Sequence, residues 1–292
     1  MRWEGDRQSD NVEDRRGDGG GGGGGFGGFG GRTVGIGTLV IALVGGAIFG
    51  VDPGTILALL GGGGGPVAVQ QQPRSAPVND RESQFVKTTL AYTEDAWGQI
   101  FAAQGSQYRP ARLVLFENAT DTGCGTGRSA TGPFYCPADS TVYIDLSFFR
   151  LMQQRFQVAG EFAQAYVIAH EVGHHVQNLL GVSDQVHNAQ QRASEKQGNA
   201  LSVKLELQAD CFAGVWANRT NKREQILEAG DVETALAAAT AIGDDALQRQ
   251  SQGTVVPDSF THGSSAQRVR WFTRGLESGE VEQCNTFEAR QL

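Results

Sequence analysis

The chain is poor in histidine, cysteine and clustered positive charge. Its 292 residues contain five His, and its 24 Lys and Arg residues are scattered along the sequence. Because no basic stripe with interleaved aromatic residues is present, a nucleic-acid partner is not expected. The net charge of −8 mainly favours solubility. The length of the chain allows one sizeable domain or two small ones. Because His and Cys are few, each of them is a candidate for a specific role.

Cysteine is absent before position 124, which excludes a lipid-modified cysteine near the N-terminus. None of the four cysteines has the C-x-x-C spacing of a metal or redox site. Their even number favours two disulfides in an oxidising compartment over the alternative of four buried thiols. Cys124 and Cys136 flank a Gly-rich loop that a short bridge could close, and Cys211 would then pair with Cys284. Three pairings remain possible from the sequence.

Glycine is concentrated at the front, with 24 of 41 glycines in residues 1–65. Residues 1–32 are therefore predicted to form a Gly-rich disordered tail. Residues 33–51 have no charge and no proline, and as a helix they would span about 28 Å, close to the ~30 Å of a bilayer core. We predict a transmembrane anchor, the alternative being a signal peptide after a long tail. Residues 52–78 are a predicted Gly/Gln/Pro linker.

Positive charge is unevenly placed around this apolar segment. No Lys or Arg follows it until Arg74, whereas five arginines precede it: Arg2, Arg7, Arg15, Arg16 and Arg32. The positive-inside rule then predicts a single-pass membrane protein with a cytoplasmic N-terminus. The domain at 79–292 is expected on the extracytoplasmic side.

Residues 79–292 predict one α+β domain, mostly helical with a small sheet. Strands are expected over 112–117 and 141–146, which are rich in β-branched and aromatic residues. The second of these is a candidate edge strand for pairing with an extended substrate. Helices are predicted from apolar periodicity and stop signals over 80–104, 147–155, 161–180, 185–219 with a break near Gly198, 223–229, 232–244 and 265–276.

Three of the five histidines lie in one apolar stretch, residues 165–177. On a helix, His170 and His174 lie about 40° apart around the axis, so both can bind one ion from the same side. Glu171 projects roughly 100° from His170, where a base acting on a metal-bound water belongs. This H-E-x-x-H pattern is typical of zinc peptidases, with chance occurrence as the alternative. His175 is displaced by about 140° from His170 and is expected to bond elsewhere.

A catalytic zinc needs a third protein ligand and one open position. The metzincin extension requires Gly and His where this chain has Gln177 and Leu180, so it is excluded. The apolar helix expected over 201–216 contains two carboxylates one turn apart. Since a buried carboxylate needs a partner, Glu206 is the predicted third ligand. Asp210 is predicted to accept the free ring N–H of a ligand histidine, the alternative being an exposed acidic pair.

The motifs HEVGHH and LELQADCFAG resemble those of the bacterial neutral zinc metallopeptidase family, whose members are membrane-anchored with a Gly-rich N-terminus. H-E-x-x-H with a later E-x-x-x-D is also similar to the gluzincins. The resemblance implies a zincin-like fold and a Zn²⁺ cofactor. Residues 261–268 resemble a later His-and-Arg motif of related membrane gluzincins, which usually have Pro where this chain has Gly263. This implies a catalytic His262 at the oxyanion, or alternatively a helix-start residue with Arg268 in a structural ion pair.

The predicted function is that of a membrane-anchored zinc metalloendopeptidase acting on proteins or peptides. Zinc would activate the water and Glu171 would accept its proton. The alternatives are a catalytically idle binding protein and an envelope protein that uses zinc only to fold. An intact Glu171 argues against the first, and the lack of a clear fourth protein ligand argues against the second.

Overall fold

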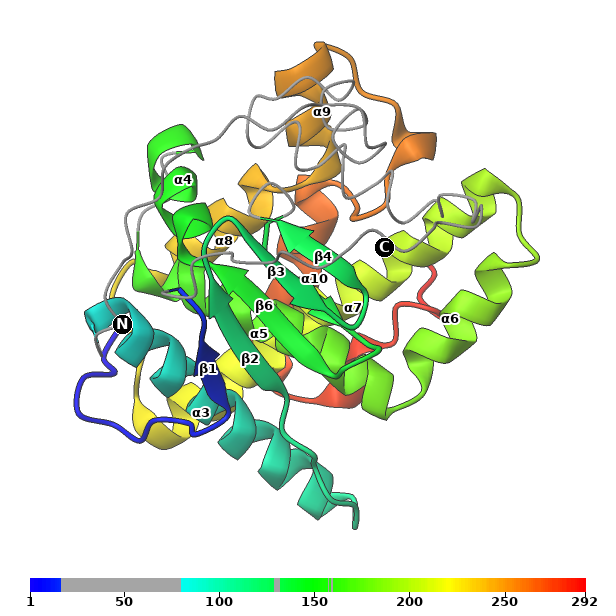
Figure 1. Ribbon diagram of the computed structural model, residues 1–292. Helices are drawn as coiled ribbons and strands as arrows, with labels where there is room; N and C mark the ends of the chain where they lie inside the picture. The colour runs from blue at the N-terminus through cyan, green and yellow to red at the C-terminus, as the bar shows by residue number, and fades with distance from the viewer. Residues whose placement is uncertain (17–79, 129–131, 157, 159) are drawn as a thin grey trace, which may run out of the picture.

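The computed structural model describes residues 1–16, 80–128, 132–156, 158 and 160–292, which form a mostly helical α+β fold with a small sheet (Figure 1). The predicted anchor (33–51), the linker (52–78) and residues 17–32 of the predicted tail lie outside the described residues. The described helices are α3 (Arg81–Ala103), α4 (Leu146–Phe156), α5 (Glu161–Leu179), α6 (Val182–Gln190), α7 (Glu195–Glu224), α8 (Asp231–Ala241), α9 (Asp244–Gln252) and α10 (Ser265–Ser278), with 3-10 turns η2 (Pro257–Ser259) and η3 (Val281–Cys284).

The main sheet has the strand order β1-β2-β6-β5. Its strands are β1 (Val12–Asp14), β2 (Arg112–Phe116), β6 (Thr141–Asp145) and β5 (Phe134–Cys136); the first three run parallel and β5 is antiparallel to β6. A separate hairpin consists of β3 (Ala119–Thr122) and β4 (Gly125–Arg128).

Strand β6 is not an edge strand. It pairs with β2 on one side and β5 on the other, so the prediction that residues 141–146 offer a free edge to substrate is wrong. The predicted strand itself is confirmed over Thr141–Asp145, and all five of its residues are buried. The sequence did not reveal that β5 covers this edge of β6. Strand β5 is only three residues long, and so short a strand carries a weak sequence signal. In the described sheet the edge on this side is β5.

Residues 1–16 belong to the fold, which corrects the predicted disordered tail over this part of 1–32. Strand β1 extends the sheet beside β2 in parallel register and is drawn in blue along its edge in Figure 1. Trp3 is buried, and its indole N–H donates to Glu161 at 2.8 Å. Arg16 forms ion pairs with Asp14 and Asp80. Nearly all of the glycines that predicted disorder lie from residue 17 onwards. They therefore give little information about residues 1–16.

The helix bounds follow the predictions closely at α3, α4, α5 and α10, differ by up to three residues at α8, and depart from them elsewhere. The break in the long central helix lies at 191–194, where Ser194 and Gln197 form a capping box at the start of α7, and not near Gly198. The helix predicted over 223–229 is wrong, because α7 ends at Glu224 and Gln225 has a left-handed backbone. Among the described residues no helix is both long and apolar enough to cross a membrane.

Small residues let helices α5, α7 and α10 approach one another closely. A Cβ at Gly214 on α7 would lie 2.1 Å from the carbonyl oxygen of Phe272, and one at Gly275 on α10 would lie 2.0 Å from that of Cys211. Gly173 on α5 faces Ala209 on α7 in the same way, at 3.1 Å from its carbonyl oxygen. Helix α7 therefore packs nearly backbone to backbone against α10 and close to α5.

Both predicted disulfides are confirmed. Cys124 bonds to Cys136 and staples the β3–β4 hairpin to β5, while Cys211 bonds to Cys284 across 73 residues. The second bond ties the C-terminal segment to α7, one residue from Asp210. Among the described residues no cysteine is free.

Candidate metal centre

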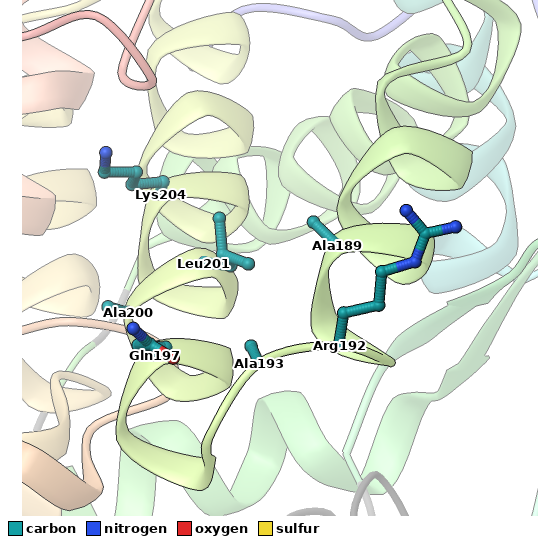
Figure 2. A pocket seen from close by; sticks show the side chains of 7 residues that line it. All are labelled: Ala189, Arg192, Ala193, Gln197, Ala200, Leu201 and Lys204. Carbon is teal, nitrogen blue, oxygen red and sulfur yellow. The ribbon is translucent and has the colours of Figure 1, made fainter.

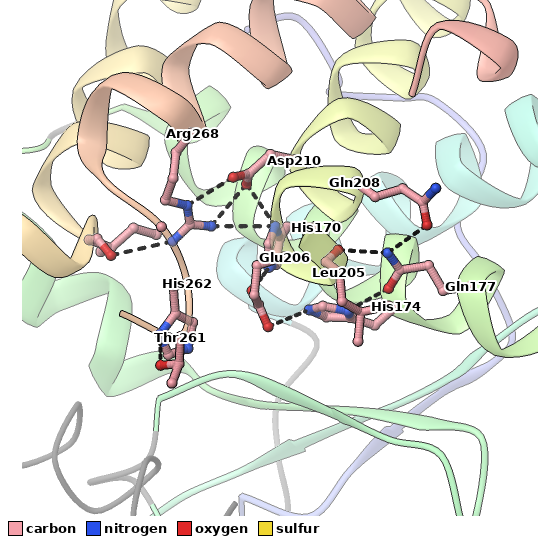
Figure 3. A network of polar contacts seen from close by, with 12 residues as sticks. His170, His174, Gln177, Leu205, Glu206, Gln208, Asp210, Thr261, His262 and Arg268 are labelled. Carbon is pink, nitrogen blue, oxygen red and sulfur yellow. Dashed lines mark hydrogen bonds and ion pairs between the residues drawn. The ribbon is translucent and has the colours of Figure 1, made fainter. Parts of the chain in front are cut away.

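Three side chains from two helices converge on one point, and we call them the metal cluster: His170 and His174 from α5, and Glu206 from α7 (Figure 3). The Nε2 atom of His170 lies 3.1 Å from Glu206 Oε2, and that of His174 lies 3.5 Å from Oε1. The histidines meet because they are one helical turn apart, and α7 brings the carboxylate to the same side. His170 is 6% exposed, so the cluster is largely shielded from solvent.

The donor set fits zinc in chemistry and in spacing. Imidazole nitrogen and carboxylate oxygen are both zinc ligands, and two ligands about 2.0–2.1 Å from a tetrahedral zinc lie roughly 3.3 Å from each other. The separations of 3.1 and 3.5 Å, which involve different oxygens of Glu206, are close to this value, and the ligand atoms of the cluster all lie within 4.8 Å of one another. Three protein ligands leave one position of a tetrahedral ion open, as a catalytic site requires.

The electrostatics of the metal cluster also favour a cation. Burial opposes charge on the His170 imidazole, but Asp210 and Glu206 outweigh it and raise its pKa to about 10. Burial likewise disfavours a charged Glu206, but the nearby His174 and His262 outweigh it and hold its pKa well below the usual value. The carboxylates around the histidines therefore favour positive charge at this point, which a metal ion can supply.

Asp210 lies behind His170 in a fully buried network (Figure 3). Its Oδ1 accepts from His170 Nδ1 at 2.8 Å and from the Tyr166 hydroxyl at 2.6 Å. Arg268 on α10 donates to both carboxylate oxygens at 2.9 Å. Burial raises the pKa of Asp210, but Arg268 and His170 outweigh it and lower it to about 2. The carboxylate is thus charged and holds the N–H of His170, leaving Nε2 for the metal.

Glu171 is 8% exposed and lies next in sequence to His170. Its negative charge helps to raise the pKa of His174, after the larger effects of burial, which lowers it, and of Glu206. Glu171 follows His170 on α5 and is not one of the three members of the metal cluster.

His262 approaches the metal cluster from the loop before α10. Asp244 holds this loop: one carboxylate oxygen accepts the backbone N–H groups of Thr261, His262 and Gly263, and the other lies 3.2 Å from His262 Nδ1. Burial lowers the pKa of His262, but Glu206 and Asp244 outweigh it and raise it. Gly263 has φ +93°, which proline cannot adopt, so the departure from the related motif has a conformational cause.

Two residues of the histidine-rich helix have contacts that bear on the earlier predictions. His175 turns away from the metal cluster, with Nε2 on the carbonyl of Arg109 at 2.7 Å and Nδ1 on the Tyr135 hydroxyl at 3.1 Å. Gln177, which sequence reasoning used only to exclude a metzincin, contacts His174 Nδ1 at 2.9 Å. The sequence patterns also did not indicate Asp244 and Tyr166 as site residues, because no local spacing connects either of them to the H-E-x-x-H motif.

A surface hollow lies between α6 and the start of α7 (Figure 2). Arg192 and Lys204 give it a positive character. It shares no lining residue with the metal cluster, so it is a separate feature; its lining is Ala189, Arg192, Ala193, Gln197, Ala200, Leu201 and Lys204.

The fold and the metal cluster together define a metal-binding α+β protein. The sequence matches the family described as "Putative neutral zinc metallopeptidase" over residues 1–287, so the chain belongs to this family and Zn²⁺ is the cofactor that the family implies. An uncharacterized protein of Escherichia coli K12, YpfJ, is 54% identical over 98% of this chain and 99% of its own length. Uncharacterized proteins of Mycobacterium bovis (Mb2605) and Mycobacterium tuberculosis H37Rv (Rv2575) are 40% identical over 84% of this chain and 86% of theirs. No solved structure matches the chain.

Proposed function

We propose that this protein is a zinc-dependent endopeptidase with a zincin-like, gluzincin-type site. The observation that carries the proposal is the metal cluster, in which two imidazoles and one carboxylate meet at the helix that also carries Glu171. Membership in a zinc metallopeptidase family supports the reaction class.

Each side chain of the site has a distinct role in this proposal. Zinc, when bound by His170, His174 and Glu206, would supply a Lewis acid that polarises the scissile carbonyl and lowers the pKa of a water. Glu171 accepts the proton of the attacking water and passes it to the leaving amine. His262, oriented by Asp244, donates a hydrogen bond to the oxygen that becomes negatively charged.

The substrate is a protein or peptide in an extended conformation. Strand β5 packs against the helix of the metal cluster, since the Tyr135 hydroxyl contacts both His175 and Asn178 of α5. It is also the described sheet edge nearest that helix, so a substrate backbone would add there as a further strand. This replaces the role first assigned to residues 141–146.

Removal of the metal should abolish activity reversibly. The zinc-loaded protein should cleave an unfolded protein substrate, and chelation should lower the rate more than about 100-fold, because Lewis-acid catalysis contributes several kcal/mol. Added zinc should restore the rate. Far-UV circular dichroism of the chelated protein serves as the control for unfolding. A stable zinc complex that cleaves no unfolded substrate would favour the binding or structural alternative.

We further propose that the domain lies on the extracytoplasmic side of the membrane. The two disulfides support an oxidising compartment. The pairing of β1 with β2 adds a condition, because a paired strand must share a compartment with its sheet. A single membrane crossing between residues 16 and 80 would separate them. We therefore propose that residues 1–16 lie on the same side as the domain, in place of the cytoplasmic N-terminus that the arginines predict.

Thiol labelling in intact cells tests this placement. Glu4→Cys and Glu288→Cys each put a cysteine at an exposed position, one before and one after residues 17–79. Both should react equally with a membrane-impermeant reagent without lysis. If Glu4→Cys reacts only after lysis while Glu288→Cys reacts before it, the N-terminus is cytoplasmic and β1 does not pair as described.

A further inference from the structure

Gln177 joins the two helices of the metal cluster through its amide nitrogen and contacts a ligand histidine through its amide oxygen. Its side chain is fully buried on α5. Its amide nitrogen donates to the carbonyl of Leu205 at 2.7 Å and to Gln208 Oε1 at 3.1 Å, both on α7. Its amide oxygen lies 2.9 Å from His174 Nδ1 (Figure 3). Leu205 directly precedes the ligand Glu206, so the contacts of Gln177 reach both ligand-bearing segments.

The orientation of this amide follows from its partners. A backbone carbonyl can only accept, so the Gln177 nitrogen must face Leu205 and its oxygen must face His174. Gln208 reinforces the same orientation, because its own nitrogen donates to the carbonyl of Cys284 at 3.1 Å and its oxygen is left for Gln177. Cys284 is held in place by its disulfide to Cys211 on α7.

An oxygen facing His174 Nδ1 requires that this nitrogen carry the proton. The neutral imidazole then has its lone pair on Nε2, the atom that faces Glu206. Asp210 imposes the same tautomer on His170, but with a charged carboxylate. The two histidines of the metal cluster are therefore oriented by different means, one ionic and one through a neutral amide.

We infer that Gln177 is a positioning residue that fixes the Nε2-binding tautomer and ring orientation of His174, with Gln208 and the Cys211–Cys284 bond holding Gln177 in turn. The inference rests on the proposed role of His174 as a metal ligand. It makes the C-terminal segment, through the Cys284 carbonyl, an indirect support of the metal cluster.

Metal binding by matched glutamine variants tests the inference. Gln177→Met keeps the length of the side chain and removes the amide, and it should weaken zinc binding by about 10–100-fold. The control is Gln190→Met, because Gln190 on α6 also ties its helix to α7, through Gly198 and Ser202, but contacts no ligand. It should bind zinc within about twofold of the wild type. Gln208→Met should have an intermediate effect, since Leu205 still orients Gln177.

Zinc affinity would be measured by competition with a chelator, and cobalt substitution would report the ligand field through its visible absorption. The Gln177→Met spectrum should differ from that of the wild type, and the Gln190→Met spectrum should not. Gln177→Glu is the second variant. It keeps an oxygen towards His174 and loses both donors to α7, so it should be less stable but should bind zinc within several-fold of the wild type.

Three outcomes would overturn the inference. They are wild-type affinity and cobalt spectrum in Gln177→Met, an equal loss of affinity in Gln190→Met, or a Gln177→Glu variant that folds and binds zinc no better than Gln177→Met. The last two would show that the tie between helices matters and the contact with His174 does not. A wild-type protein that binds no zinc would instead refute the proposed function, so the two failures are distinguishable.

Discussion

Glu171→Gln should lower kcat for peptide hydrolysis by about 10²–10⁴-fold, the range that a positioned general base contributes. The amide has the same shape as the carboxylate but cannot accept a proton from water. Zinc content should stay at the wild-type level, because Glu171 is not among the three members of the metal cluster. The measurement is a cleavage assay at saturating substrate with metal analysis of the same sample.

The matched control is Glu195→Gln, which makes the same chemical change at an exposed position at the start of α7. It should cleave at the wild-type rate. A Glu171→Gln protein with full zinc and full activity would show that another group accepts the proton, and the assigned role of Glu171 would then be wrong.

Arg268→Met should lower the free energy of unfolding by about 3–5 kcal/mol, measured by urea denaturation of the metal-free protein. Arg268 is 3% exposed, and it is the cation that neutralises the fully buried Asp210. Removing it leaves a carboxylate buried with only the Tyr166 hydroxyl and His170 as partners. A buried charge that loses one of its partners costs far more than a surface pair gains.

Two further variants separate this effect from a general loss of arginine. Arg219→Met removes a half-exposed arginine that pairs with Glu280 and donates to the Gly279 carbonyl, and it should cost about 1 kcal/mol. The double variant Arg268→Met with Asp210→Asn removes both charges and should recover part of the lost stability. A loss below 1 kcal/mol in Arg268→Met would contradict the buried ion pair.

Local patterns predicted a large part of the site. The four-residue spacing of His170 and His174 places both imidazoles on one side of α5 whatever the surroundings of the helix, because helical geometry alone decides it. The apolar context of Glu206 indicated a buried carboxylate, and α7 brings it to the same two histidines. The cysteine count predicted two disulfides, and the pairing suggested by the short loop is the one found.

Contacts between distant segments were beyond the reach of those patterns. Strand β1 is three residues long and pairs with a strand 100 residues later, so neither periodicity nor composition indicated it. The same holds for Asp244 and His262, which are joined across 18 residues of loop and helix. Gln177 looked like an ordinary polar residue, because its function depends on Leu205 and Gln208 on another helix.

The sequence by itself determined which side chains of α5 can share one metal ion, since the spacing of His170 and His174 follows from the α-helical repeat. It also determined the mostly helical α+β class. Only the tertiary structure decided which strand forms the sheet edge, that residues 1–16 join the sheet, and which groups orient each histidine. Those outcomes depend on how helices and strands pack against one another, as α7 and α10 do at Gly214 and Gly275. Such packing depends on the complete surfaces of both elements, which no short sequence pattern contains.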